Sequence, residues 1–268
     1  MNRVEEGDEG DVNEEVVNSW EEQARELVDD YQPEDVWNFD ETGLIWQALP
    51  EKRLNEKTKT CRGGKKSKYR NTWAFFANAA GGKEEPIVIA KTANPLCFKA
   101  LKNKRKHVNC FYFSNAKAWT RAEIITQILN RLNDRLKREN RNVILFMDNA
   151  PCLPRDLEFS NIKIAWLPCN TTSRTQPLDA GIIKVWKVNV RRKLLQYVCS
   201  QLEGKNAASD AIKSVNMLMN IQWGRKAWDD VRSETVIKCF KKVGLCPRRR
   251  RNWRCSKSCT HYRSFCFY

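Results

Sequence analysis

Three aspartates lie at sequence positions that an α/β fold would bring close together. Asp40 directly follows the strand-like stretch VWNF, Asp148 follows the apolar run VILFM, and Asp179 lies in the first turn of a helix that Pro177 is expected to open. Buried carboxylates are costly unless they are paired, hydrogen-bonded or bound to a cation. Oxygen ligands suit Mg²⁺ or Mn²⁺. Two such ions about 4 Å apart can activate a water or hydroxyl and stabilise the leaving oxygen of a phosphodiester.

The alternative is that each aspartate caps a helix or a turn. Capping is a common role of Asp and is the more frequent one for a single residue. Three aspartates in this layout, within a strongly basic region, make the two interpretations about equally favoured.

The charge of the chain favours a polyanionic partner. The 268 residues carry a formal net charge of +16. Residues 1–51 hold 17 acidic and two basic side chains, whereas residues 52–268 hold 46 basic and 15 acidic ones. Nucleic acid is the expected partner, because phosphate neutralisation by Lys and Arg dominates its binding. An anionic membrane surface is the weaker alternative, since no basic amphipathic helix with a clean apolar face is found.

Composition excludes several other classes of protein. The chain is 41% hydrophobic with ten tryptophans, which is enough for a core and excludes global disorder. Because no run of 18 apolar residues occurs, we expect no membrane helix. The acidic start lacks the apolar stretch of a signal peptide. Eleven cysteines without a secretory signal then favour a reducing cytosolic or nuclear compartment over a disulfide framework.

A basic, glycine-containing loop over residues 51–70 is the candidate contact for a DNA backbone. Its expected DNA-binding residues are Lys65, Lys66, Lys68 and Arg70. A solvated charged loop is the alternative. The GGKKS stretch is not a phosphate-binding loop, because Lys59 stands where that motif requires glycine.

Periodicity predicts a mixed α/β domain with an antiparallel and a parallel part. We expect strands over 35–39, 71–79, 87–90, 109–113, 142–147 and 162–167, with a further extended piece at 44–49. Helices are expected over 13–30, 121–138, from Pro177 onward, and at about 207–221 and 228–243. Thr120 and Glu123 have the spacing of a capping box for the second helix.

Four segments resemble motifs of one family. Residues 38–44 (NFDETGL) resemble the first catalytic signature of the pogo/Tigger/jerky branch of DDE transposases. Residues 88–99 (VIAKTANPLCFK) resemble its middle motif and residues 147–151 (MDNAP) its second catalytic motif. The third is matched by LPCNTTS at 167–173 and QPLDAGII at 176–183. The motifs occur in the family's order, and the resemblance covers about residues 15–243.

The resemblance implies a ribonuclease-H-like fold, with a mixed five-stranded sheet and helices on both faces. It also implies an ancestral activity of cutting and rejoining DNA strands with two divalent ions, Mg²⁺ or Mn²⁺. Carried over by position, Asp40, Asp148 and Asp179 are the catalytic residues and metal ligands. Glu41 would point to the opposite face of an extended chain, so we expect only a supporting role for it.

The chain departs from the family pattern in two places. Family members usually carry two helix-turn-helix modules before the catalytic domain, and no segment here matches them. Leu153 stands where the family tends to have a histidine. We divide the chain into an acidic lead and helix (1–30), an endonuclease-like core (31–200), a helical extension (201–245) and a basic cysteine-rich tail (246–268).

The tail is expected to be poorly ordered. Its candidate zinc ligands lack a CxxC pair, which disfavours a metal site there. These ligands are Cys246, Cys255, Cys259, Cys266 and His261.

Two functions follow for a nuclear, transposon-derived, DNA-associated protein that is not bound to membranes. In the first, the three aspartates hold metal and cleave DNA or transfer its strands. In the second, a domesticated protein uses its basic surface to bind DNA without catalysis. A basic structural or RNA-binding module is the rival from another class, and homo-oligomerisation is left open. The structural or RNA-binding module would be preferred if the three carboxylates lay far apart, and their convergence would favour the two DNA-associated functions.

Overall fold

A computed structural model describes most of the chain. The described residues are 14–48, 69–99, 101, 108–149, 157–169, 171–203 and 207–247. Of the four expected DNA-binding residues, only Arg70 falls within them. Lys65, Lys66 and Lys68 lie outside, as do Leu153 and most of the cysteine-rich tail.

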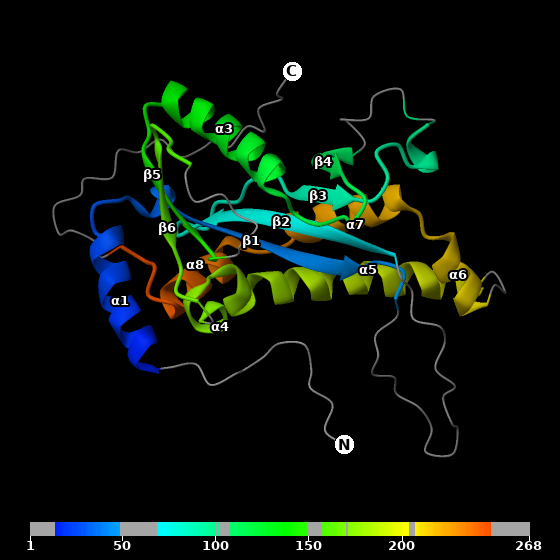
Figure 1. Cartoon of the computed structure of the whole chain (residues 1–268). Coiled ribbons are helices and arrows are strands. Elements are labelled where there is room, and N and C mark those ends of the chain that lie inside the picture. The colour runs from blue at the N-terminus through cyan, green and yellow to red at the C-terminus, as the bar shows by residue number, and fades with distance from the viewer. Residues whose placement is uncertain are drawn as a thin grey trace, which may run out of the picture.

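A six-stranded mixed sheet forms the centre of the molecule, in the order β4-β3-β2-β1-β5-β6 (Figure 1). β1 pairs antiparallel with β2 and parallel with β5, and β2 pairs antiparallel with β3. The two outer pairs, β3–β4 and β5–β6, are parallel. The strands are β1 (Val36–Ile45), β2 (Arg70–Asn78), β3 (Ile87–Ala90), β4 (Phe111–Ser114), β5 (Val143–Met147) and β6 (Ile162–Trp166).

The sheet confirms the predicted α/β class and differs from the prediction in two details. Phe111–Ser114 completes the sheet as an edge strand, so it has six strands where five were expected. The two pieces expected at 35–39 and 44–49 are one strand. β2 pairs with β1 over its whole length, from Trp37 opposite Asn78 to Ile45 opposite Arg70, and this pairing carries the extended backbone past Asp40.

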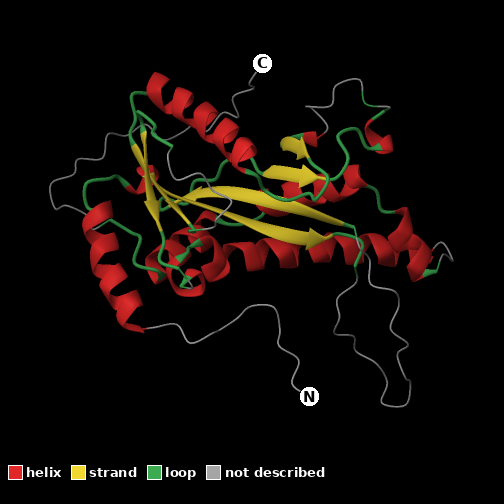
Figure 2. Ribbon diagram, viewed as in Figure 1, coloured by secondary structure: helices red, strands yellow, loops and turns green. Residues whose placement is uncertain are grey.

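Helices cover both faces of this sheet, as predicted (Figure 2). The long helix α3 packs on one face, and α1, α5, α7 and α8 pack on the other. The helical elements are α1 (Glu14–Val28), η1 (Pro33–Asp35), η2 (Leu96–Phe98), α3 (Ala122–Arg138), α4 (Thr172–Thr175), the π-helical turn η3 (Leu178–Ile182), α5 (Ile183–Glu203), α6 (Ala208–Ser214), α7 (Met217–Asp229) and α8 (Ser233–Lys242). Among the described residues, no helix has the length and apolar character needed to cross a membrane.

The α3 face is closed by aliphatic residues at helical spacing. The buried side of α3 meets the odd-numbered residues of β1, Trp37 and Phe39, and the alternate residues of β5. The predicted capping box is wrong. Arg121 occupies the N-cap position without a capping hydrogen bond, and Thr120 is buried beside it. The buried α3 residues are Ile125, Ile128, Leu129, Leu132 and Leu136.

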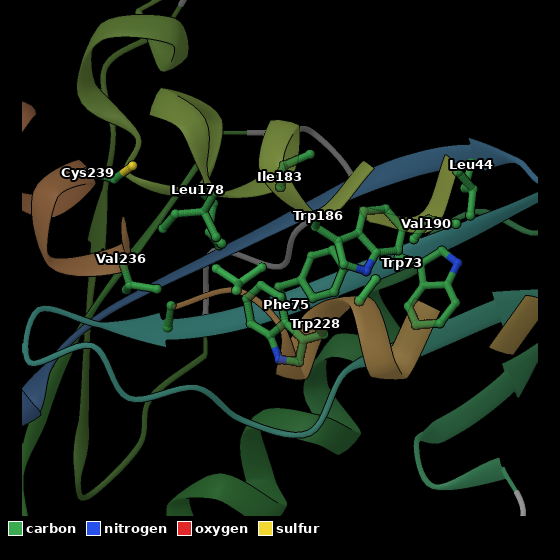
Figure 3. Close-up of a cluster of buried hydrophobic side chains, with 14 of the residues drawn as sticks. Leu44, Trp73, Phe75, Leu178, Ile183, Trp186, Val190, Trp228, Val236 and Cys239 are labelled. Atoms are coloured by element: carbon green, nitrogen blue, oxygen red, sulfur yellow. The ribbon is translucent and has the colours of Figure 1, made fainter. Parts of the chain in front are cut away.

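An aromatic cluster closes the opposite face (Figure 3). The ring of Phe75 on β2 stacks on Trp228 of α7 with centroids 4.4 Å apart and lies 4.9 Å from Trp186 of α5. Trp73 lies 5.1 Å from Trp186, whose indole N–H donates to the Gly224 carbonyl at 2.9 Å. Buried aromatics carry large apolar areas, and the indole N–H groups of Trp186 and Trp228 donate to backbone carbonyls, whereas that of Trp73 has no partner among the described residues. The cluster therefore fixes α5 and α7 against the sheet.

Gly224 is where α7 approaches the sheet most tightly. A Cβ at this position would lie 2.3 Å from the outer ring atoms of Trp73, closer than real contacts allow. The absence of a side chain therefore allows the indole to pack directly on the helix backbone.

We predict that Gly224→Ala lowers the free energy of unfolding by about 1–3 kcal/mol, as overpacked cores do. At an exposed helical position the same change would stabilise by about 1 kcal/mol. Urea unfolding of the single variant and of Gly224→Ala/Trp73→Phe measures the effect. Because the shorter ring leaves room for the methyl group, the double variant should lose less stability than the sum of the two single variants.

Candidate active site

A buried asparagine joins the three elements that carry the predicted site. Asn38 on β1 is fully buried, and its Nδ2 donates to the Phe146 carbonyl of β5 at 3.0 Å. Its Oδ1 accepts from the Leu178 N–H, the first residue of η3, at 3.0 Å. One side chain therefore ties β1 to β5 and to the start of η3. Asp40 lies two residues further on the same face of β1, Asp148 two residues beyond Phe146, and Asp179 next to Leu178.

Asp40 is a buried carboxylate in the middle of β1 and not at a strand end. Only 7% of the residue is exposed. The Glu41 N–H donates to its Oδ1 at 2.7 Å, while Oδ2 is buried without a hydrogen-bond partner among the described residues. β5 ends at Met147, and its pairing with β1 ends at Asn38, so no residue of β5 pairs with Asp40. The carboxylate thus sits where the parallel half of the sheet stops.

Asp179 lies against Asp40. It occupies the second position of η3, and the non-helical backbone at Gly181 separates this turn from the straight part of α5. The residue is exposed, and its carboxyl group lies close enough to that of Asp40 for each to influence the pKa of the other. Partial burial of this carboxyl raises the pKa of Asp179, which the interaction with Asp40 and the charge of Lys187 partly offset.

The electrostatics of Asp40 follow from this pairing. Burial raises the pKa of Asp40 well above its usual range, and the charges of Asp179 and Asp148 raise it further. The Gln176 side chain and the Glu41 N–H act in the opposite direction as hydrogen-bond donors. Two carboxylates sharing a buried site resist ionising together.

Asp148 is half-buried just beyond the end of β5. Its charge acts on Asp40 and on Glu41, so it lies near both of these residues. The described residues nevertheless contain no group of three or more His, Cys, Asp or Glu side chains placed to hold a metal ion. The structure therefore places Asp179 and Asp148 near Asp40 without assembling the three into a metal-binding group.

Glu41 faces the opposite side of β1, as strand alternation predicts. It shares that side with Trp37 and Phe39, and its Oε2 is buried without a hydrogen-bond partner among the described residues. Burial raises the pKa of Glu41, and the Asp148 charge adds to this. The Thr120 hydroxyl and the charge of Arg70 lower it. Arg70 therefore lies near the carboxylates, at the first position of β2.

Three further residues of the site were not predicted from the sequence. Asn38 is two residues before Asp40 and therefore points to the same face of β1. It could have been found from the sequence, because a polar residue on the buried face of a central strand needs hydrogen-bond partners. Gln176 directly precedes Pro177 and is fully buried next to Asp40. Lys187 follows the core residue Trp186 on α5. Burial lowers the pKa of Lys187, and the charges of Asp179 and Asp40 act in the opposite direction. No periodicity distinguishes it from other lysines of that helix.

We predict that Asn38→Leu lowers the free energy of unfolding by about 2–4 kcal/mol, because it leaves the Phe146 carbonyl and the Leu178 N–H buried without partners. Asn189→Leu is the matched control, since that half-buried amide makes only two long hydrogen bonds of 3.5 Å, to the Ala227 carbonyl and from the Arg192 guanidinium. The control should cost less than about 1 kcal/mol. Equal losses in the two variants, measured by urea unfolding, would contradict the assigned role of Asn38.

We further predict that Asp40→Asn stabilises the metal-free protein at neutral pH. A raised pKa means that the folded chain holds the proton more tightly than the unfolded chain. Stability therefore falls as pH rises from the unfolded value near 4 through the higher folded value. The advantage of Asp40→Asn should grow over this range and shrink toward pH 4.

Urea unfolding in EDTA between pH 4 and 8 tests this. The exposed Asp134 on α3 provides the control, because Asp134→Asn should change stability by less than about 0.5 kcal/mol throughout. An advantage for Asp40→Asn that does not vary with pH would show that ionisation of the buried Asp40 carboxyl is not its cause.

Comparison with known proteins places this chain in a family. Residues 68–240 match the model of the DDE superfamily endonuclease domain. The chain is 29% identical over 223 residues to Tigger transposable element-derived protein 4 of Mus musculus, covering 81% of this chain and 41% of that protein. It is 26% identical over 234 residues to CENP-B homolog protein 2 of Schizosaccharomyces pombe, covering 83% and 44%. The chain thus spans about two fifths of the length of these relatives.

Among solved structures, the chain is similar to the Mos1 strand transfer complex, with 13% identity and a TM-score of 0.49 over 91% of this chain and 63% of that one. The α/β sheet with helices on both faces agrees with the predicted ribonuclease-H-like class. The family model covers more than half of the chain, including Asp148, Asp179 and the strands that flank β1. The chain therefore belongs to the DDE superfamily endonuclease family.

Proposed function

We propose that this domain is a DNA endonuclease or strand-transfer domain in which Asp40, Asp148 and Asp179 hold two divalent ions, Mg²⁺ or Mn²⁺. The observation that carries the proposal is the pairing of the buried Asp40 carboxylate, whose Oδ2 has no hydrogen-bond partner among the described residues, with the nearby carboxyl group of Asp179. Nothing in the apolar core requires this pair, and its burial opposes folding. Such perturbed carboxylates are typical of sites that bind a cation or move a proton.

The residues fit a hard divalent cation. All three donors are carboxylates, the ligand type that Mg²⁺ and Mn²⁺ prefer. The unpartnered Oδ2 of Asp40 is a buried oxygen whose charge only protonation or a cation can satisfy. Bound ions would supply activation of a water or hydroxyl and stabilisation of the leaving oxygen of a phosphodiester.

The surrounding side chains orient the carboxylates and place positive charge beside them. Asn38 holds η3 against β1 and so keeps Asp179 beside Asp40, and Gln176 acts as a hydrogen-bond donor toward Asp40. Lys187 and Arg70 flank the carboxylates and are placed to attract the phosphates of a DNA strand. DNA as substrate is supported by the basic charge of the chain, and a nuclear location follows from that substrate.

A domesticated, non-catalytic DNA-binding protein is the second candidate. It is favoured by one observation, the absence of a three-carboxylate metal group among the described residues. In that case the basic surface alone would act, and the aspartates would be inherited without use. The two candidates differ in their response to divalent metal.

We predict that Mn²⁺ raises the melting temperature of the full chain by mass action, and that Asp148→Asn abolishes this increase. Without metal, Asp148→Asn should be as stable as the wild type or slightly more so, because one repelling charge is removed. If Asp148 only capped a turn, the substitution would leave the metal response intact, since Asn caps about as well as Asp. Melts with Mn²⁺ and with EDTA separate these cases.

Asp134→Asn is the matched control and should keep the full metal response. Nicking of supercoiled plasmid in Mn²⁺ provides the second measurement, and Asp40→Asn, Asp148→Asn and Asp179→Asn should each abolish it. Equal metal shifts in the wild type and Asp148→Asn would remove that residue from the site. DNA binding without a metal response and without nicking would favour the non-catalytic candidate.

A further inference from the structure

An exposed tryptophan lies beside Arg70 on the face of the sheet that Glu41 shares with α3. Trp119 lies in the loop between β4 and α3 and is 55% exposed. The Arg70 guanidinium lies 6.0 Å from its ring centroid and the Lys117 ammonium lies 5.9 Å from it. An aromatic face with cations beside it is the arrangement that binds an unstacked base together with its phosphates.

The loop holds this ring in a fixed position. Asn115 Nδ2 donates to the Trp119 carbonyl at 2.7 Å, and its Oδ1 accepts from the Lys117 and Trp119 N–H groups at 3.2 Å each. The Thr72 hydroxyl of β2 donates to the Ala118 carbonyl at 2.7 Å. Ala118 itself is buried. Because hydrogen bonds hold this loop, the ring loses little conformational entropy when a base stacks on it, and less of the stacking free energy is offset.

The same loop reaches the site. Thr120, which follows Trp119, lies close enough to act on Glu41 through its hydroxyl. Arg70 packs over Gly43 of β1, where a Cβ would lie 2.5 Å from its Nε. The glycine therefore leaves room for the guanidinium against β1, on the side of the strand that Glu41 faces. The ring, Arg70 and Glu41 thus lie on one face of the sheet, beside the strand that carries Asp40.

We propose that Trp119, with Arg70 and Lys117, forms a stacking site for an unpaired nucleotide beside Glu41, on the face of β1 opposite to Asp40. The bases of an intact duplex are already stacked on one another, so the site favours single-stranded or locally opened DNA. The inference rests on the proposed function, in which a DNA strand binds at this edge of the sheet. It adds that this strand is single-stranded or locally opened.

The test compares two single strands that differ only in their bases. Fluorescence anisotropy in EDTA at low salt measures binding of the full chain to a 15-nucleotide oligo(dT) and to an abasic strand of equal length. The wild type should bind oligo(dT) about tenfold or more tightly than the abasic strand, as expected when one base stacks. Trp119→Ala should remove this preference and change the affinity for the abasic strand by less than about twofold. Trp119→Phe should keep most of the preference.

The exposed Val16 on α1 provides a control, because α1 lies at the opposite end of the sheet from the tip of β1 (Figure 1). Val16→Ala should behave as the wild type. Equal weakening of both strands by Trp119→Ala would overturn the inference, since a structural role would affect both. No effect on either strand would overturn it as well and would point to a protein contact. Neither result bears on metal-dependent melting or nicking, so the proposed function is judged separately.

Discussion

The two hydrogen bonds of Asn38 are the constraint on which the site depends. A fully buried amide is tolerated only when its donor and acceptor are both used, and here they are used on different elements. The donor fixes the parallel neighbour β5 and the acceptor fixes the first N–H of η3. Moving any one of the three elements would leave a buried polar group without a partner. The relative positions of Asp40 and Asp179 are therefore set by a group that takes no part in their chemistry.

The aromatic cluster stabilises the fold and so offsets the unfavourable burial of the Asp40 and Asp179 carboxyl groups. Phe75, Trp186 and Trp228 pack α5 and α7 onto β2 (Figure 3). Asp179 lies in η3, directly before α5. The unfavourable Asp40–Asp179 contact persists because the helix that carries Asp179 cannot move away without opening the cluster. Strained or repelling groups survive in folded proteins when the surrounding packing overdetermines their positions.

Much of the fold could be predicted from the sequence because apolar runs and turn residues report directly on burial. The run VILFM predicted the central strand β5, and strand alternation placed Asp40 and Glu41 on opposite faces. The length of β1 was not predictable in the same way, since it depends on pairing with β2 and not on local composition. Asn38 and Gln176 were missed for a related reason. Their roles lie in hydrogen bonds and electrostatic contacts to segments more than 100 residues away, which periodicity does not record.

The arrangement of charge around the site explains why metal and DNA binding should depend on each other under the proposed function. The carboxylates lie inside, while Lys187 and Arg70 lie beside them. The cations attract a phosphodiester to the sheet edge, but the ionised aspartates repel it from the reacting position. Protonation of Asp40 would lessen the repulsion and would also remove a ligand that divalent cations require. Only a bound cation both neutralises the pair and leaves its oxygens available, so a strand can come into contact with the carboxylates only when that charge is supplied.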